Sequence, residues 1–203
     1  MIFYQLDRSN FAEFKRTGFS EFRRDRERSG GWKGPAPTCP QCATRIGALK
    51  WIPPYVVRLT RTKFGDFCSD GTSVLLSERF RSAWLASNLK GIEFATSSVQ
   101  IIGHCEDKTP PYYLANFAHT LTVLDEEASG LIVERKVGCA TCRVTARASL
   151  ERLRLDERSW DGEAAFLPSG LFGVILVSQE FVNFVAEHSL ENFLFVHQDD
   201  YRE

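Results

Sequence analysis

The sequence lacks a large excess of charge of either sign. Its 203 residues include 25 Lys and Arg and 26 Asp and Glu, which gives a formal net charge of -1 at pH 7. A chain with such balanced charge has no global field that attracts nucleic acid or an anionic membrane surface. The Arg-rich residues 23–28 are interleaved with acids and predict a solvated helix face. We therefore expect neither nucleic acid nor membrane among the partners, and any charged binding surface must be local.

The sequence also lacks a long apolar run. Residues 113–124 and 171–177 are its most apolar stretches, and they are interrupted by polar residues or are short, whereas a helix that spans a bilayer needs about 20 apolar residues. The first seven residues do not combine a basic segment with an apolar run, as a signal peptide would. The sequence therefore predicts a cytoplasmic protein, in which cysteines stay reduced.

Several catalytic motifs are missing as well. The chain has no Gly-rich phosphate loop, no nucleophile elbow and no His-Glu-x-x-His helix. What it does have is the composition of a globular protein, with 43% hydrophobic residues that include 16 Phe and 4 Trp. This is enough apolar material for a sizeable core. We therefore expect a folded protein, and the absence of these motifs gives no indication that it is an enzyme.

Short strands that alternate with helices are the main pattern along the chain. The apolar run Val74–Ser77 predicts a buried strand, Ser77 can cap a helix over 78–88, and Gly91 can end that helix before a strand at 92–95. The middle of the chain is rich in β-branched and aromatic residues and predicts a mostly antiparallel sheet. Its expected strands lie within residues 99–104, 112–124 and 130–137. The predicted fold class is α+β.

The last third of the chain repeats the pattern of the first. Residues 74–94 align without a gap on residues 175–195, with five identities. We therefore expect one domain, residues 1–203, that contains two pseudo-repeats at about 39–96 and 139–197. Chance similarity between two strand–helix–strand units is the alternative.

The cysteines form two Cys-x-x-Cys pairs with nearly the same offset as this repeat. Cys39 and Cys139 lie 100 residues apart, as do Cys42 and Cys142. Each turn can direct two thiolates at one metal ion, and two turns complete the closed tetrahedral site that structural Zn²⁺ prefers. We predict a structural, zinc-ribbon-like site that joins the two units; buried thiols without metal are the alternative. A zinc-ribbon adaptor for nucleic acid would use the same cysteines, but the balanced charge argues against it.

A different grouping of these residues is compatible with an enzyme. His104 and Glu106, together with Cys139 and Cys142, resemble the His-x-Glu and Cys-x-x-Cys signatures of zinc-dependent nucleobase deaminases, in which the Glu transfers protons. Gly138 stands where that signature has Pro, and the surrounding residues predict strands where deaminases have helices. A deaminase-like enzyme is therefore the alternative function.

The motifs together resemble those of a known family. The turn Cys-Pro-x-Cys at 39–42, the second cysteine pair, Trp-Asp-Gly at 160–162 and an apolar strand at 171–178 that enters a helix are similar to the myxobacterial double-CxxCG motif proteins. Ala43 and Arg143 stand where each family motif ends in Gly. That family includes immunity proteins of contact-delivered polymorphic toxins. The resemblance implies a non-enzymatic cytosolic protein that neutralises a cognate toxin domain by binding it.

Two acidic segments are candidates for contact with such a toxin. The first is a turn at Asp125, Glu126 and Glu127, and the second contains Asp199 and Asp200 near the C-terminus. Charge complementarity accelerates and strengthens the docking of protein partners. The alternative is that both segments are ordinary solvated acids.

Overall fold

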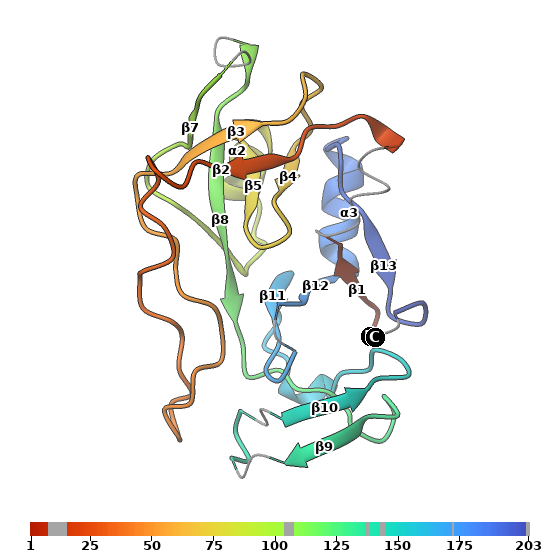
Figure 1. Ribbon diagram of the computed structural model, residues 1–203. Helices are drawn as coiled ribbons and strands as arrows, with labels where there is room; N and C mark the ends of the chain where they lie inside the picture. Colours follow the sequence, from red (N-terminus) through yellow and green to blue (C-terminus); the bar gives the residue numbers. More distant parts are fainter. Residues whose placement is uncertain (8–15, 104–107, 137–138, 143–144, 172, 202–203) are drawn as a thin grey trace.

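The computed structural model describes residues 1–7, 16–103, 108–136, 139–142, 145–171 and 173–201 (Figure 1). The chain has a mixed α+β fold, as the sequence predicts. The described helices are α2 (Glu78–Ala86), α3 (Gln179–Glu187) and the 3-10 helix η2 (Glu157–Ser159). The strands are β1 (Phe3–Leu6), β2 (Phe22–Arg24), β3 (Val56–Leu59), β4 (Phe67–Ser69), β5 (Val74–Ser77), β6 (Ile92–Phe94), β7 (Gln100–Ile101), β8 (Tyr112–His119), β9 (Ile132–Lys136), β10 (Thr145–Ser149), β11 (Ala165–Leu167), β12 (Ile175–Ser178) and β13 (Phe195–His197).

One large sheet forms the centre of the molecule. Its strand order is β13-β1-β12-β11-β8-β5-β4, and β6 also pairs with β8. All neighbouring strands in it are antiparallel except β11 and β8, which are parallel. Two smaller sheets, β2-β3-β7 and β9-β10, accompany it. The order places the first strand of the chain between the last two.

The two faces of the large sheet have different covers. Successive side chains of a strand point to opposite faces, so Leu76 of β5 faces α2 and α3 while Leu75 faces the small sheet β2-β3-β7. The two helices pack against each other through aromatic side chains, and the ring centroids of Phe80 and Phe181 are 6.1 Å apart. On the face opposite the two helices, Leu153 packs with Phe3 of β1. The core therefore has a layer of side chains on each side of the sheet.

The two strand–helix–strand units are arranged in the same way. β5 and β6 lie on either side of the antiparallel strand β8, and both Val74 and Phe94 pair with Ala115. β12 and β13 lie on either side of β1 in the same register, because their equivalents Ile175 and Phe195 both pair with Leu6. Each helix thus connects two parallel strands that enclose a third. The registers agree with the sequence offset between residues 74–94 and 175–195.

Two expectations are wrong. The strands in the middle of the chain do not form one sheet, because β7 pairs in parallel with β3, β8 belongs to the large sheet and β9 pairs with β10. The Arg-rich segment does not form a solvated helix, since β2 covers Phe22–Arg24 and a turn follows it. Phe22 is buried and stacks on Trp51, whereas the guanidinium of Arg24 lies 3.8 Å from the ring centroid of Trp32. Pairing with β3 and burial of Phe22 outweigh the local helix preference of the charged residues. Among the described helices, none is long and apolar enough to cross a membrane.

Candidate metal centre

The first cysteine pair lies on a tight turn in the long loop between β2 and β3. The backbone N–H of Cys39 donates to the carbonyl of Thr44 at 2.8 Å, and the N–H of Ala43 donates to the carbonyl of Cys39 at 2.9 Å. Ala43 has a φ of 56°, in the left-handed region that favours Gly. This is the position at which the related motif has Gly. The turn therefore closes without the Gly, at a cost in backbone strain.

The second pair lies on a turn between β9 and β10. The Oγ1 of Thr141 donates a hydrogen bond to the Oε1 of Gln41 on the first turn. The Oγ of Ser169 donates to the carbonyl of Cys142 and thereby ties this turn to the segment after β11. Arg143, the residue that replaces Gly here, lies outside the described residues. Side-chain contacts thus join the two turns to each other and to the sheet.

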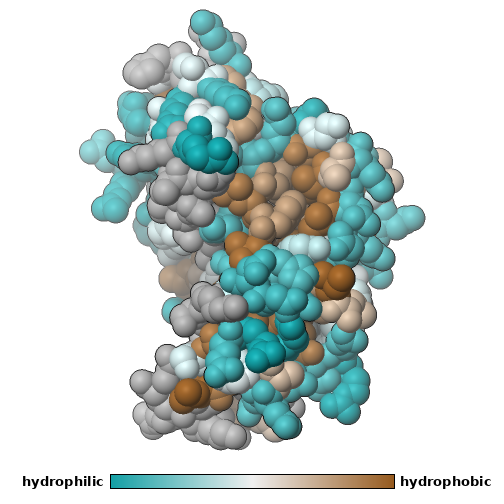
Figure 2. Space-filling model, turned by 90° about the vertical axis from the view of Figure 1, so that its right-hand side faces the viewer, coloured by the Kyte–Doolittle hydropathy of each residue, from teal (hydrophilic) through white to brown (hydrophobic). Residues whose placement is uncertain are grey.

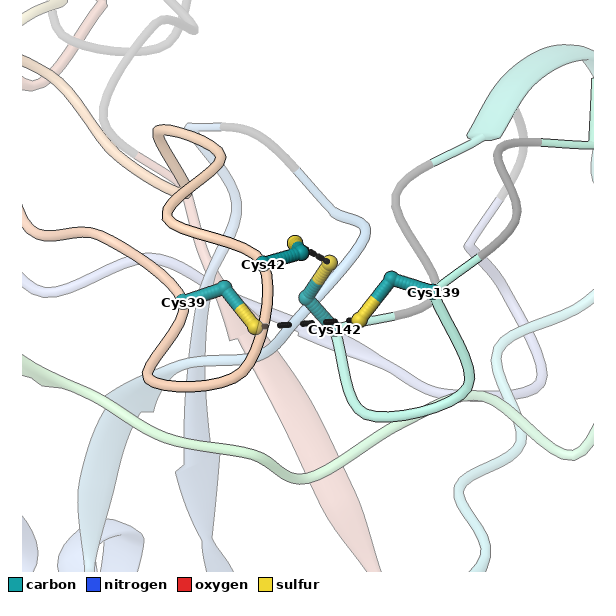
Figure 3. Close-up of side chains that lie close together, drawn as sticks. All are labelled: Cys39, Cys42, Cys139 and Cys142. Carbon is teal, nitrogen blue, oxygen red and sulfur yellow. Dashed lines mark hydrogen bonds between the residues drawn. The ribbon is translucent and has the colours of Figure 1, made fainter.

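The four sulfur atoms form one cluster (Figure 3). The sulfurs of Cys39, Cys42, Cys139 and Cys142 all lie within 4.8 Å of one another. Two distances that cross between the turns, Cys39 to Cys139 and Cys42 to Cys142, are each 3.8 Å. A tetrahedron with zinc–sulfur bonds of about 2.3 Å has edges of about 3.8 Å, whereas a disulfide bond is about 2.05 Å long. The spacing fits four ligands around a single metal ion.

Local hydrogen bonds favour the thiolate form that metals bind. The hydroxyl and then the backbone N–H of Thr44 donate to the sulfur of Cys42 and lower its pKa to about 6. The backbone N–H groups of Cys142 and Thr141 lower the pKa of Cys139. Cys39 and Cys142 are buried, Cys139 is half-buried and Cys42 is exposed. One edge of the cluster therefore faces solvent, so an ion has a path of entry.

The geometry of the cysteine cluster favours the four-cysteine site over the alternative, deaminase-like set of ligands. His104 and Glu106 lie outside the described residues, so their position relative to the thiols is not part of the structure. Cys39 and Cys42, which that grouping leaves unused, lie beside Cys139 and Cys142. Four thiolates complete a tetrahedron and leave no position for the water that a deaminase must activate. The arrangement fits a closed structural site.

A family comparison agrees with the role implied by the motifs. The model of the immunity protein family Imm11 matches residues 55–200, which is more than half of the chain. The chain belongs to this immunity protein family. No curated protein matches it. The matched range includes the second cysteine pair of this Imm11 protein but begins after the first.

The two acidic segments of the immunity protein both contact the same residue, Arg154. The N–H of Asp125 donates to the carbonyl of Arg154 at 3.0 Å, and the guanidinium of Arg154 pairs with the carboxylate of Asp199. The side chain of Asp125 also accepts the N–H of Ala128, which closes its own turn. Arg154 holds the pKa of Asp199 below its ordinary value. Asp125 and Asp199 thus have partners within the chain.

Sequence reasoning missed the residues that support the cysteine turns. Thr44 could have been expected, because an N–H two residues after the second Cys of such a turn often points at the sulfur. Gln41 and Thr141 each directly precede the second Cys of their Cys-x-x-Cys motif, and nothing in the sequence indicates that they are in contact. Ser169 lies 27 residues from Cys142. Its contact with Cys142 depends on the packing of β11, and the sequence around either residue does not predict it.

Proposed function

We propose that this immunity protein binds a cognate toxin domain in the cytoplasm and neutralises it, and that it has no enzymatic activity of its own. Membership of the Imm11 immunity protein family carries the proposal. Immunity proteins act by covering or distorting a toxin's active site, which needs a stable, well-shaped surface and no catalytic residues.

The same proposal includes a structural Zn²⁺ held by Cys39, Cys42, Cys139 and Cys142. The 3.8 Å spacing of the sulfurs and the N–H groups directed at them support this choice of ion. Bound there, zinc would connect the loop between β2 and β3 to the turn between β9 and β10. These segments lie together beside the large sheet (Figure 1). The ion would therefore hold the toxin-binding protein in one shape.

We also propose a single domain, residues 1–203, derived from two related units at about 39–96 and 139–197. The equal registers of β5-β8-β6 and β12-β1-β13 support a common origin. Helices from both units share one hydrophobic cluster, in which Phe80 contacts Phe181. Such shared burial makes separate folding of either unit unfavourable.

Acidic side chains are proposed to contact the toxin. Glu126 has partners within the chain, and Asp125 and Asp199 are engaged as described above. Glu127 and Asp200 are exposed, and a partner could bind their carboxylates without breaking a hydrogen bond that the structure shows. We expect Glu127→Lys combined with Asp200→Lys to slow association with a basic toxin severalfold at low salt.

Coexpression tests the toxin-binding role. The toxin encoded beside this gene should be tolerated by cells that also produce the protein, and the two purified proteins should elute together in gel filtration. Toxicity in the presence of the protein, with no complex, would overturn the proposed function. The double charge reversal should weaken the complex more at 50 mM than at 500 mM salt, since screening removes exposed charge interactions.

Metal analysis tests the site. Protein purified without chelator should contain one zinc ion per chain, and Cys39→Ser should lose it. Cys68→Ser is the matched control, because Cys68 is buried and its sulfur donates to the carbonyl of Ser20, away from the cluster. A Cys39→Ser protein that keeps zinc would contradict the four-thiolate site and favour one built with His104.

A further inference from the structure

The strand β13 is an edge strand of the large sheet, and no other described strand pairs with its outer side. On one side it pairs with β1, and the flanking bonds from Asp7 N–H to the Leu194 carbonyl (2.9 Å) and from Gln198 N–H to the Phe3 carbonyl (3.1 Å) continue that ladder. Because hydrogen-bonding residues alternate along an antiparallel strand, the backbone groups of Phe195 and His197 point the other way.

The outward groups are largely unused. Within the described chain, the N–H and carbonyl of Phe195 and the N–H of His197 have no hydrogen-bond partner. The carbonyl of His197 accepts the N–H groups of Asp200 and Tyr201. The opposite edge strand, β4, differs: all its residues are buried, and the N–H of Phe67 donates to the carbonyl of Glu191. Of the two edge strands, and counting only partners within the described part of the chain, β13 is therefore the one with free outward backbone groups.

Apolar side chains accompany this edge. Residues 193–196, Phe-Leu-Phe-Val, are all partly exposed, whereas every residue of β5 and β12 is buried. Figure 2 shows the side of the molecule that carries α3 and β13, and a hydrophobic patch lies on it next to hydrophilic surface. Edge strands of this kind invite pairing with another chain unless charge or Pro protects them. Neither Lys nor Pro occurs here.

The charge of this region is strongly one-sided. Residues 179–201 contain five Asp and Glu and no Lys or Arg, although the whole chain is nearly neutral. Glu187 and Glu191 are exposed before β13, and Asp200 is exposed after it. A partner segment that lies along β13 would meet carboxylates at both ends. Charge complementarity therefore favours a partner segment with basic residues.

We infer that the open edge of β13 is the toxin-docking surface, and that an extended segment of the toxin with apolar residues and flanking Lys or Arg adds to the sheet there as a further strand. This inference rests on the proposed function. Main-chain hydrogen bonds to Phe195 and His197 supply affinity, and the apolar strip and the acids supply specificity.

A proline at the edge tests strand addition. His197→Pro removes an outward N–H, together with the imidazole that accepts the N–H of Asp199 and contacts Tyr4. It leaves the bonds of residues 194, 196 and 198 toward the β1 side in place, and Pro is tolerated on an edge strand. Thr96→Pro is the matched control. Thr96 occupies the equivalent position after β6 in the first unit, is exposed, and its N–H has no partner among the described residues.

The readouts are the Kd of the toxin complex and amide hydrogen exchange. We expect His197→Pro to weaken toxin binding about tenfold or more, Thr96→Pro to leave it unchanged, and the amides of Phe195 and His197 in the wild-type protein to exchange more slowly in the complex. Melting temperatures of both variants must stay close to that of the wild type. If His197→Pro unfolds the protein, the test is the amide exchange of Phe195 and His197 in the wild-type protein, compared between its free and toxin-bound forms.

Two failures are distinguishable. Toxin binding by His197→Pro with wild-type affinity, or unchanged exchange at Phe195 and His197 in the complex, overturns the edge-strand inference alone. Absence of any complex with the wild-type protein overturns the proposed function, and the docking surface with it.

Discussion

Ala43 shows how a single residue can conflict with the local backbone. Its φ of 56° places the Cβ in a region that costs an L-residue about 1–2 kcal/mol. The surrounding hydrogen bonds of the Cys39–Thr44 turn hold it there. The cysteine cluster depends on this turn, so the strain is a local cost of bringing Cys39 and Cys42 to the same side.

Replacing Ala43 by Gly should relieve that strain. We expect Ala43→Gly to raise the free energy of unfolding by about 0.5–1 kcal/mol, because the relief exceeds the added entropy of Gly in the unfolded chain. Ala140→Gly on the second turn is the control, since Ala140 has no positive φ, and it should destabilise by about 0.5 kcal/mol. Urea unfolding measures both. A destabilised Ala43→Gly protein would show that the turn is unstrained.

The serines at the N-cap positions of α2 and α3 differ, although the sequence places them equivalently. The Oγ of Ser77 accepts the N–H of Phe80 at 3.1 Å and donates to Asp66 at 2.5 Å. The Oγ of Ser178 is buried and has no hydrogen-bond partner among the residues that the structure describes.

Alanine substitutions should separate the two roles. Ser77→Ala should cost about 1–2 kcal/mol, because it removes a cap and leaves Asp66 with one donor fewer. Ser178→Ala should change the free energy of unfolding by less than about 0.5 kcal/mol or stabilise slightly, since it removes an unsatisfied buried hydroxyl. Denaturant unfolding of both proteins provides the comparison, and equal losses would contradict this account.

At the scale of elements, Asp66 connects the two strand–helix–strand units. Its buried carboxylate accepts hydrogen bonds from Ser77 at the start of α2, from the guanidinium of Arg79 and from the N–H of Glu191 beyond α3. Burial raises the pKa of Asp66, but the donors outweigh it, and the pKa lies below its ordinary value of 3.8. The ionised form therefore stabilises the folded state.

This connection predicts a specific pH dependence. A carboxyl whose folded pKa is depressed contributes fully above its unfolded pKa and loses the contribution as the pH falls through the folded pKa. Asp66→Asn should cost about 3 kcal/mol near pH 7, and the difference from the wild type should shrink below about pH 4. Unfolding both proteins at several pH values tests this, and metal loss in acid affects them equally. A difference independent of pH would contradict it.

Elements with strong local signals were predicted best. The strand over residues 74–77, the helix that follows it and the next strand appear as β5, α2 and β6, because apolar periodicity, cap and Gly all agree. β8 ends at His119 rather than near residue 124, because its partner β11 ends at Leu167. The N–H of Thr120 donates the last bond of this pairing, to the carbonyl of Leu167. Residue patterns alone do not show where a neighbouring strand ends.

At the scale of the whole molecule, the cysteine cluster closes a loop of 100 residues between Cys39 and Cys139. The first turn lies on a loop, residues 25–55, with little regular structure, and the second lies beyond the edge of β9. With the proposed metal ion bound, a cross-link of this span would remove conformational entropy from the unfolded chain that is equivalent to about 4–5 kcal/mol in the chain-entropy model. The proposed metal ion would therefore stabilise the entire fold.

Metal removal should act on both global and local stability. A chelator should lower the melting temperature by about 10 °C, the size expected for loss of such a cross-link in a chain of this length. Hydrogen exchange should increase most in residues 30–51, while β5 and β12, which are fully buried, stay protected. An unchanged melting temperature, or uniform loss of protection, would contradict the proposed role of the ion.

The sequence by itself determined the two Cys-x-x-Cys pairs, the α+β class and the strand–helix–strand segments at residues 74–94 and 175–195, because spacing and periodicity are local properties of the chain. Only the tertiary structure decided that the four sulfurs converge, that β1 lies between β12 and β13, and that β13 is left as an open edge beside an acidic, apolar surface. These features arise from contacts between residues that lie 100 positions apart for the cysteines and nearly 200 positions apart for β1 and β13. Such contacts are chosen by global burial and chain closure, which no local pattern encodes.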